Sequence, residues 1–257
     1  MTAQRLNLNA DLGESFGAWS MGDDAAMLEI VTSANVACGF HAGDPTVMRR
    51  TLALARERGV SIGAHPSFPD LQGFGRRRIE MAPADVEAML IYQVGALQGL
   101  ARAERTEVTH VKPHGALNNM ACEDPRLAAT VARAVRALDP QLILLAPALS
   151  PLAAAGREAG LRVVDEVYAD RAYSDDATLV PRSRPGAVLH GADECVAHVM
   201  RIVERGAITS VNGQVLPAPV QSICVHGDGA DAVAAARAIV AALQGAGHVL
   251  APLPALA

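Results

Sequence analysis

The chain has 257 residues, of which 51% are hydrophobic and 19% are charged, and its formal net charge is -5. This length allows one large domain or two small ones, and the apolar content excludes an intrinsically disordered chain. The net negative charge disfavours a nucleic-acid surface, and no run approaches the roughly 20 apolar residues of a membrane span. The N-terminus lacks a signal-peptide core, so we expect a cytoplasmic protein.

Short apolar runs alternate with longer Ala-, Leu- and Arg-rich helical patterns along the chain, which is typical of repeated βα units. The predicted strands cover residues 5–11, 33–38, 60–65, 108–113, 142–146, 162–167 and 222–226. The predicted helices cover residues 22–31, 45–58, 83–103, 125–138, 149–159, 191–205 and 229–244. No linker, repeat or low-complexity tract divides the sequence, so residues 1–257 are predicted to form a single domain.

Polar and apolar residues alternate along four of the predicted strands. In the first strand, Asn7, Asn9 and Asp11 share one face, and in the fourth strand His110 and Lys112 share one face. Central strands of an open parallel sheet are covered by helices on both faces and tend to be apolar throughout. The alternation therefore favours a closed barrel with a polar lumen and an outer wall of helices. In such barrels the reactive groups gather at the C-terminal ends of the strands.

Acids, histidines and basic residues lie at or just after the predicted strand ends. They are Asp11, Glu14, His41, His65, Lys112, His114, Glu166, Asp170, Arg171, His226 and Asp228. Lys112 is the only lysine among the 22 basic residues, which suggests a requirement for an amine at that position. A cluster of this kind can shift pKa values and perform acid–base chemistry at neutral pH.

Asp11, His41 and His65 could alternatively bind a metal ion through two imidazoles and a carboxylate, leaving positions open for water. The chain contains no H-E-x-x-H motif, and its H-x-x-x-H pair, His110 and His114, lies outside this triad. The sequence therefore favours a site without a metal, and the metal triad stays the alternative.

Three loops have features that suit an anionic ligand. Arg76 and Arg77 belong to a glycine-rich cationic turn at residues 73–78, and residues 227–229 open the last predicted helix, where free N–H groups attract phosphate or carboxylate. Residues 168–190 carry Arg171, Arg182 and Arg184, lack a clear period and are predicted to form a lid. The chain has no G-x-x-x-x-G-K-[ST] loop, which excludes a Walker-type nucleotide site.

Seven segments spread along the chain resemble the LamB/YcsF family, which is associated with the A subunit of 5-oxoprolinase. They are LNADLGESFG ending at Gly17, ANVACGFHAGDP (34–45), GAHPSFPDLQGFGRR (63–77), HVKPHGAL (110–117), DRAY (170–173), LVPRSRPGA (179–187) and ICVHGD (223–228). The resemblance implies an α/β fold, an irregular seven-stranded (β/α)7 TIM-like barrel of the glycoside hydrolase/deacetylase type. It also implies a hydrolase that works with two partner subunits, 5-oxoprolinase subunits B and C. The implied reaction is the ATP-dependent opening of the cyclic amide 5-oxo-L-proline to L-glutamate, with ATP as cosubstrate.

This chemistry needs a base for water, a cation for the substrate carboxylate and donors for the developing negative charge. The catalytic candidates are Asp11 or Glu14 for water activation, His41 and His65 for positioning water or substrate, and Lys112 and His114 for stabilising negative charge. The candidates for binding substrate or phosphate are Asn9, Arg76, Arg77, Asp170, Arg171, His226 and Asp228.

The sequence departs from the family pattern in two places. Asn118 stands where the family's GALYN motif has tyrosine, and residues 229–231 replace the usual Thr/Asn-Pro-Gly stretch. Two other functions would suit the same strand-end residues. Stoichiometric zinc and activity without nucleotide would favour a metal-dependent amidohydrolase or carbohydrate deacetylase. Unchanged turnover of an Asp11→Asn complex would favour a non-catalytic carboxylate-binding subunit.

Overall fold

A computed structural model describes residues 3–226 and 231–256 of the chain. The strands are β1 (Arg5–Leu12), β2 (Ser33–Ala37), β3 (Ser61–His65), β4 (Val108–Val111), β5 (Ile143–Pro147), β6 (Arg162–Tyr168), β7 (Ala207–Thr209), β8 (Val215–Pro217), β9 (Ser222–Val225) and β10 (Val249–Leu250). The helices are α1 (Asp24–Met27), α2 (Pro45–Arg58), α3 (Pro83–Ala103), α4 (Gly115–Glu123), α5 (Pro125–Leu138), α6 (Pro151–Glu158), α7 (Ala192–Arg205), α8 (Ala232–Gly245) and the short 3-10 helix η1 (Leu253–Ala255).

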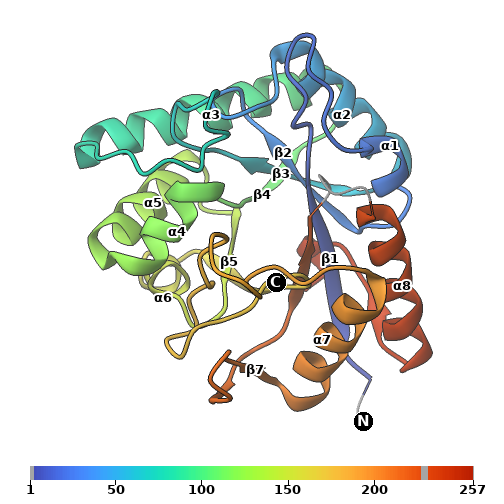
Figure 1. The fold of residues 1–257 in the computed structure, drawn as a ribbon. Helices are drawn as coiled ribbons and strands as arrows, with labels where there is room; N and C mark the ends of the chain where they lie inside the picture. The colour runs from blue at the N-terminus through green and yellow to red at the C-terminus, as the bar shows by residue number, and fades with distance from the viewer. Residues whose placement is uncertain (1–2, 227–230, 257) are drawn as a thin grey trace.

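Seven parallel strands form a closed barrel, as the alternation predicts. The hydrogen-bonded order is β1-β2-β3-β4-β5-β6-β9, and the pairing of β9 with β1 closes the ring. Figure 1 shows the helices arranged around these strands. The short β10 pairs with the first residues of β1, at the end of the barrel opposite to the strand C-termini.

The two faces of the strands have different chemistry. Leu6, Leu8 and Ala10 of β1 are fully buried in the hydrophobic core between the strands and the helices. Asn7 and Asn9 are also fully buried, but they alternate with those residues and donate hydrogen bonds to side chains of the neighbouring strands β2 and β9. The lumen face of β1 is therefore polar, and hydrogen bonds satisfy these two buried amides.

Aspartate–proline pairs begin two of the outer helices. The Asp44 side chain accepts hydrogen bonds from the backbone N–H groups of Thr46 and Val47 at the start of α2. Asp124 caps α5 in the same way. Proline suits the next position because its missing N–H would have had no helical partner.

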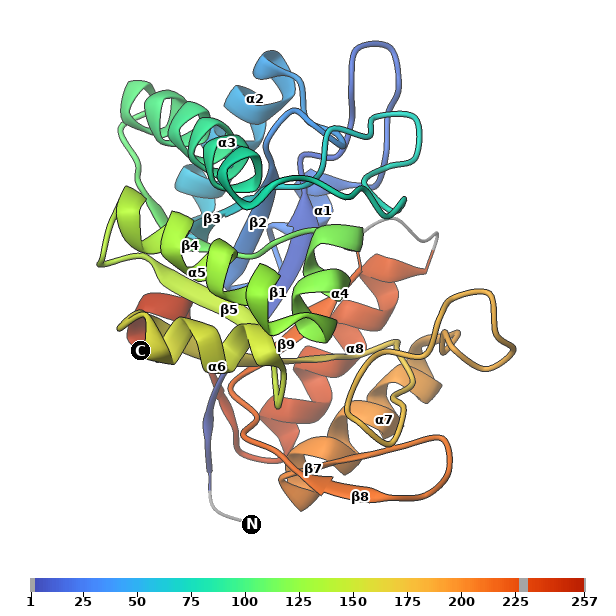
Figure 2. The same cartoon turned by 90° about the vertical axis from the view of Figure 1, so that its left-hand side faces the viewer.

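Several elements differ from the prediction. Helix α1 has only one turn, where ten residues were predicted, and α4 was not predicted at all. Asn118 and Asn119 lie inside α4, and asparagine is a weak helix former, so the pattern there carries little helical signal. The hairpin β7–β8, seen beside α7 in Figure 2, consists of three-residue strands that are too short to show a period. Among the described residues, none of the helices combines the length and the apolar character that a membrane crossing requires.

Candidate active site

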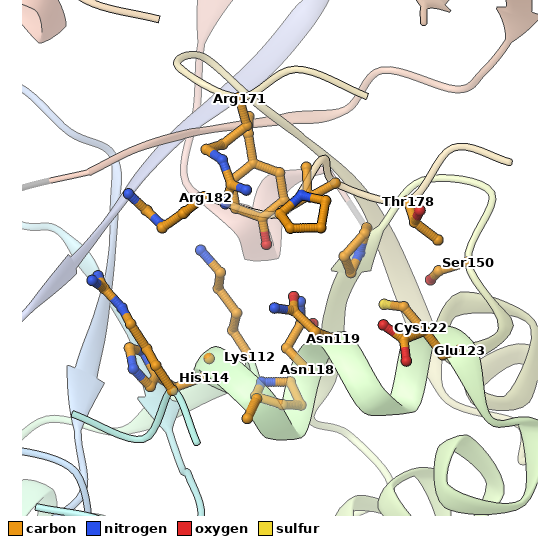
Figure 3. Close-up of a pocket in the computed structure, with 18 of the residues that line it drawn as sticks. Lys112, His114, Asn118, Asn119, Cys122, Glu123, Ser150, Arg171, Thr178 and Arg182 are labelled. Carbon is orange, nitrogen blue, oxygen red and sulfur yellow. The ribbon is translucent and has the colours of Figure 1, made fainter. Parts of the chain in front are cut away.

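A pocket of about 400 Å³ lies at the C-terminal ends of the barrel strands. Its ionisable lining residues are Asp11, Glu14, His65, Arg76, Arg78, Lys112, His114, Cys122, Glu123, Tyr168, Arg171, Asp176, Arg182 and His226. In Figure 3, the Lys112 side chain points into the pocket between His114 and Asn118, with Arg171 and Arg182 across from it. The strand-end residues from distant parts of the sequence therefore face one common space.

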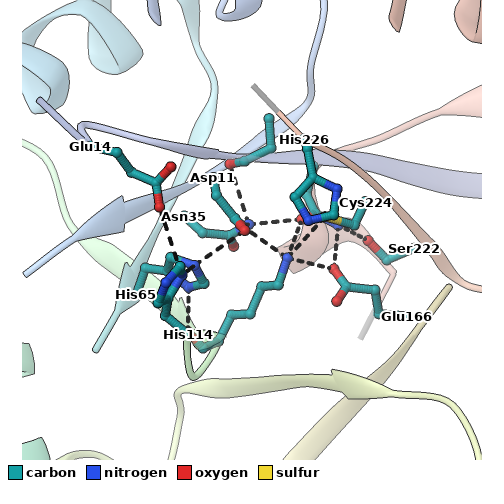
Figure 4. Close-up of polar contacts among 12 residues, drawn as sticks. Asp11, Glu14, Asn35, His65, His114, Glu166, Ser222, Cys224 and His226 are labelled. Atoms are coloured by element: carbon teal, nitrogen blue, oxygen red, sulfur yellow. Dashed lines mark hydrogen bonds and ion pairs between the residues drawn. The ribbon is translucent and has the colours of Figure 1, made fainter. Parts of the chain in front are cut away.

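The Lys112 ammonium lies at the centre of the barrel mouth. Its Nζ is 3.0 Å from Asp11 Oδ1, 3.1 Å from Glu166 Oε1, 3.3 Å from Asn9 Oδ1 and 3.1 Å from Cys224 Sγ (Figure 4). Burial alone would lower the pKa of Lys112, but the negative charge of Asp11 and its neighbours raises that pKa well above its ordinary value. Lys112 is consequently a permanent buried cation and is unsuited to act as a base or a nucleophile at neutral pH.

Both carboxylate oxygens of Asp11 are engaged. Oδ1 accepts hydrogen bonds from Asn35 Nδ2 at 2.8 Å and from Lys112 Nζ, and Oδ2 is 3.2 Å from His65 Nε2. Burial acts to raise the pKa of Asp11, but the charges of His65 and Lys112 outweigh it and hold that pKa well below its ordinary value. Asp11 therefore stays ionised and is a weak base.

Three imidazoles form a compact cluster beside Asp11. His65 Nδ1 is 2.6 Å from the backbone oxygen of Lys112, and His114 Nε2 is 2.9 Å from the backbone oxygen of Phe74. The remaining nitrogens of these two rings, His65 Nε2 and His114 Nδ1, face each other at 2.9 Å. The His41 ring stacks on the His114 ring with centroids 3.8 Å apart and planes at 6°.

Glu14 joins this cluster from the loop after β1. Its Oε1 is 3.3 Å from His41 Nε2 and 3.7 Å from His114 Nδ1. Burial, and then the nearby charge of His65, lower the pKa of His41 well below its ordinary value, so His41 is neutral at neutral pH. A neutral His41 donates its Nε2–H to the Glu14 carboxylate and thereby orients it.

The donor atoms of Glu14, His41, His65 and His114 lie within 4.8 Å of one another, which makes this the group to test for a metal. It differs from the triad weighed from the sequence, because Asp11 is bound to Lys112 instead. An imidazole binds a metal in the plane of its ring, along the nitrogen lone pair. An ion between the parallel rings of His41 and His114 would lie outside both planes. The arrangement therefore does not fit a metal shared by all four residues.

A second acid–base pair lies on the opposite wall of the pocket. His226 Nδ1 is 2.7 Å from Asp170 Oδ1, and Arg182 donates to His226 Nε2 at 3.0 Å. Because an arginine can only donate, the His226 ring accepts at Nε2 and carries its proton at Nδ1. Burial raises the pKa of Asp170, but the hydrogen bond and charge of His226 more than offset this and leave that pKa below its ordinary value.

The segment 168–190, predicted as a lid, covers one side of this pocket. Arg171 is buried and donates to the backbone oxygens of Val180 at 2.7 Å and Ala187 at 3.3 Å, so its guanidinium links two parts of the segment. Tyr173 forms a β-bridge with Leu179 inside it. The segment is therefore held by its own polar contacts, and its movement as a lid stays a prediction.

The arginines of the 73–78 turn have different orientations. Arg76 and Arg78 line the pocket, and the Arg76 guanidinium is 5.0 Å from the centroid of the Phe74 ring. Arg77 is not among the described lining residues. Its Nε donates to Asp70 Oδ1 at 2.8 Å, which directs the guanidinium away from a substrate. Asp228 lies outside the described residues.

The roles assigned from the sequence omit Asn35, Glu166 and Arg182. Asn35 pairs in register with Asp11 on the neighbouring strand, and its place on the same strand face as Ser33 is the available signal. Glu166 appeared at a strand end but received no role, although it contacts Lys112. Arg182 lies in the segment 168–190, which has no clear period to show which side chains face the pocket.

Comparison with known proteins identifies relatives along the whole described chain. The model of the LamB/YcsF family matches residues 6–257. A protein from Azoarcus sp. that is named as the A subunit of 5-oxoprolinase is 60% identical, over 97% of this chain and 98% of its own length. A protein of the same name from Gluconobacter oxydans is 53% identical, over 96% of this chain and 97% of its own.

Solved structures show the same fold. The lactam utilization protein from Thermus thermophilus has a TM-score of 0.91 and 40% identity, and the match covers 97% of this chain and 100% of that one. A peptidoglycan N-acetylglucosamine deacetylase from Eubacterium rectale has a TM-score of 0.51 at 12% identity, covering 98% of this chain and 89% of that one, so it shares the fold alone.

Proposed function

The chain belongs to the LamB/YcsF family, and from this membership and its pocket we propose that it is the lactam-opening subunit of an ATP-dependent 5-oxoprolinase. The proposed reaction is the hydrolysis of 5-oxo-L-proline to L-glutamate, coupled to ATP hydrolysis. The relatives named for 5-oxoprolinase and for lactam utilization support this substrate class. Because the 5-oxoprolinase relatives are named as one subunit of that enzyme, they also support partner subunits, which we propose are subunits B and C.

The observation that carries the proposal is the joint placement of a carboxylate, imidazoles and a buried ammonium around one pocket. Opening a γ-lactam requires a base that takes a proton from water, a positive charge near the developing oxyanion, and an acid for the departing nitrogen. These three groups all occur within the cluster of Glu14, His65, His114 and Lys112.

Of the two candidate bases, we assign water activation to Glu14. The charges of Lys112 and His65 keep the pKa of Asp11 low, and its oxygens are already engaged by three donors. Glu14 contacts the neutral His41 ring and lines the same pocket. Asp11 then serves to hold Lys112 and His65 in place.

Lys112 supplies the fixed positive charge in this scheme, because its ammonium persists at neutral pH and points into the pocket. A preorganised charge in a site of low dielectric stabilises the transition state more strongly than the same charge does in water. The arginines Arg76, Arg171 and Arg182 at the pocket wall are the proposed partners of the substrate carboxylate or of a phosphate.

ATP is the proposed cosubstrate, and we assign its phosphoryl transfer to one of the partners because this sequence has no Walker loop. The test measures ATP-dependent glutamate release from 5-oxoproline by the chain alone, by the partners alone and by the mixture. Only the mixture should be active. Full activity of the chain alone would refute the division of labour, and nucleotide-independent activity with bound zinc would favour an amidohydrolase.

A matched pair of variants tests the base. Glu14→Gln should reduce turnover of the assembled complex by at least ~100-fold, the usual range for loss of a general base. Glu57→Gln is the control, since Glu57 is exposed on α2 and pairs with Arg56 at 3.7 Å. Its turnover should stay close to that of the unmodified complex. Unchanged turnover in both Glu14→Gln and Asp11→Asn would instead support a non-catalytic binding role.

A further inference from the structure

The hydrogen-bond partners of His65 and His114 indicate how many protons their rings carry. A backbone carbonyl oxygen can only accept, so each ring nitrogen bonded to one must carry a hydrogen. His65 Nδ1 therefore holds a proton, directed at the backbone oxygen of Lys112, and His114 Nε2 holds one, directed at the backbone oxygen of Phe74. These two protons would leave both rings neutral.

The contact between the two rings requires a third proton. His65 Nε2 and His114 Nδ1 are 2.9 Å apart, a normal hydrogen-bond distance at which two lone pairs would repel each other. One of the two nitrogens must donate, and the pair then carries three protons and one positive charge. We propose that His65 and His114 form an imidazolium–imidazole pair at neutral pH, and that its shared proton is delivered to the lactam nitrogen during ring opening. This inference rests on the proposed function.

The surrounding charges place the positive charge on His65. Asp11 Oδ2 on β1 lies 3.2 Å from His65 Nε2, so a carboxylate compensates an imidazolium there. Burial, followed by the charges of His41 and His65, lowers the pKa of His114 well below its ordinary value, so His114 is the neutral member. His114 Nδ1 then accepts a hydrogen bond from the protonated Nε2 of His65.

The remaining charged groups around the pair come from three other segments. Glu14 Oε1, after β1, is 3.7 Å from His114 Nδ1 and favours the positive charge. The Lys112 ammonium, just after β4, disfavours a positive charge on the pair. This ammonium is itself neutralised by Asp11 and Glu166. Arg76 acts on the adjacent His41, lowering the pKa of that ring further. The carboxylates nearest the pair therefore offset its charge.

In the ring-opening step the pair delivers its proton and recovers it through Glu14, while the coupled phosphoryl transfer from ATP is assigned to a partner subunit. As the water oxygen attacks the ring carbonyl carbon, Glu14 accepts one proton from that water. When the C–N bond breaks, its electron pair goes to nitrogen, which takes the shared proton from the pair. Glu14 then returns its proton to His114 Nδ1 across the 3.7 Å gap, and the pair again holds three protons. The proton lost by water has moved to the amine.

The first experiment counts the protons directly. Nitrogen NMR of the ¹⁵N-histidine-labelled chain between pH 6 and 9 should show three protonated nitrogens on the two rings, assigned with His65→Asn and His114→Asn variants. Only two protons at pH 7, or a stoichiometric metal bound by these rings, would overturn the inference. This measurement uses the unmodified chain and needs no catalytic activity.

The second experiment tests delivery of the proton to nitrogen in the assembled complex. A lactone analogue of the substrate has an oxygen leaving group that needs less protonation than nitrogen. His65→Asn should reduce lactam turnover by at least ~100-fold and lactone turnover by less than ~10-fold. Equal losses for the two substrates would overturn the acid role. His248→Asn, a buried histidine at the opposite end of the barrel, is the control and should leave both rates unchanged.

The two proposals can fail separately. If the unmodified complex does not open the lactam, the proposed function is wrong, while the proton count still decides whether the charged pair exists. If the complex is active and the pair has two protons, only the present inference is wrong. If His65→Asn does not fold, the His114→Asn variant still assigns the resonances of one ring, and the proton count of the unmodified chain remains decisive.

Discussion

Replacing Lys112 with methionine is the most informative perturbation of the barrel mouth. Methionine matches the length of the lysine stem but removes the ammonium from a side chain that is 2% exposed. The ammonium contacts Asp11 and Glu166 at 3.0 and 3.1 Å, so the change leaves two buried carboxylates without their cation. The variant should be destabilised at neutral pH, even though a hydrophobic side chain fits the space.

The magnitude follows from the cost of breaking a buried ion pair by removing one partner, about 3–5 kcal/mol. For a chain of this size, each kcal/mol shifts the thermal midpoint by about 2–4 °C, so the expected decrease is roughly 6–20 °C. Arg237→Met removes an exposed cation that is 3.6 Å from Glu29, and it should leave the midpoint unchanged. The assay is thermal unfolding of the three chains at equal concentration.

The loss of stability in Lys112→Met should change with pH in a definite direction. The pKa of Lys112 is raised on folding, so its stabilisation is present below its ordinary pKa of 10.5 and is lost as pH rises through the folded value. The pKa of Asp11 is lowered on folding, so its stabilisation is present above 3.8 and is lost as pH falls through the folded value. The deficit of Lys112→Met should therefore be largest near neutral pH and narrow in acid. A midpoint equal to that of the unmodified chain at pH 7 would refute this account of the ion cluster.

Three further changes test other parts of the structure. Gly63→Ala should destabilise the chain by about 1–3 kcal/mol in urea unfolding, because the new Cβ would lie 2.2 Å from the His110 ring, whereas Gly95→Ala on α3 has open space and should be neutral or stabilising. Asp11→Asn should flatten the loss of stability below pH 4, measured as the thermal midpoint against pH, and an unchanged slope would contradict the low pKa of Asp11. Trp19→Ala should weaken assembly with the partner subunits in a binding titration, since Trp19 is 63% exposed in the loop after β1, while Tyr92→Ala on α3, 64% exposed, should bind normally.

The alternation of polar and apolar residues is enough to predict the barrel and the end of it that holds the polar groups. Alternation along β1 and β4 separates Asn9, Asp11 and Lys112 from the apolar residues that face the helices. This pattern is local, because successive side chains of a strand point to opposite sides whatever the neighbouring strand is. Since parallel strands end at the same rim, their terminal residues could also be expected to converge.

Which groups touch, and therefore which are charged, depends on how the barrel closes. Asp11 and Glu14 are three residues apart in the sequence, yet one is bound to Lys112 and the other to His41. The orientation of Arg77 toward Asp70 was equally invisible in the cationic turn. A pKa depends on burial and on distances of a few ångströms to other charges, and these distances join residues from strands that lie far apart in the chain. The strand pattern specifies the face on which a residue lies, whereas its charge state is decided by the partners that closure of the barrel brings within reach.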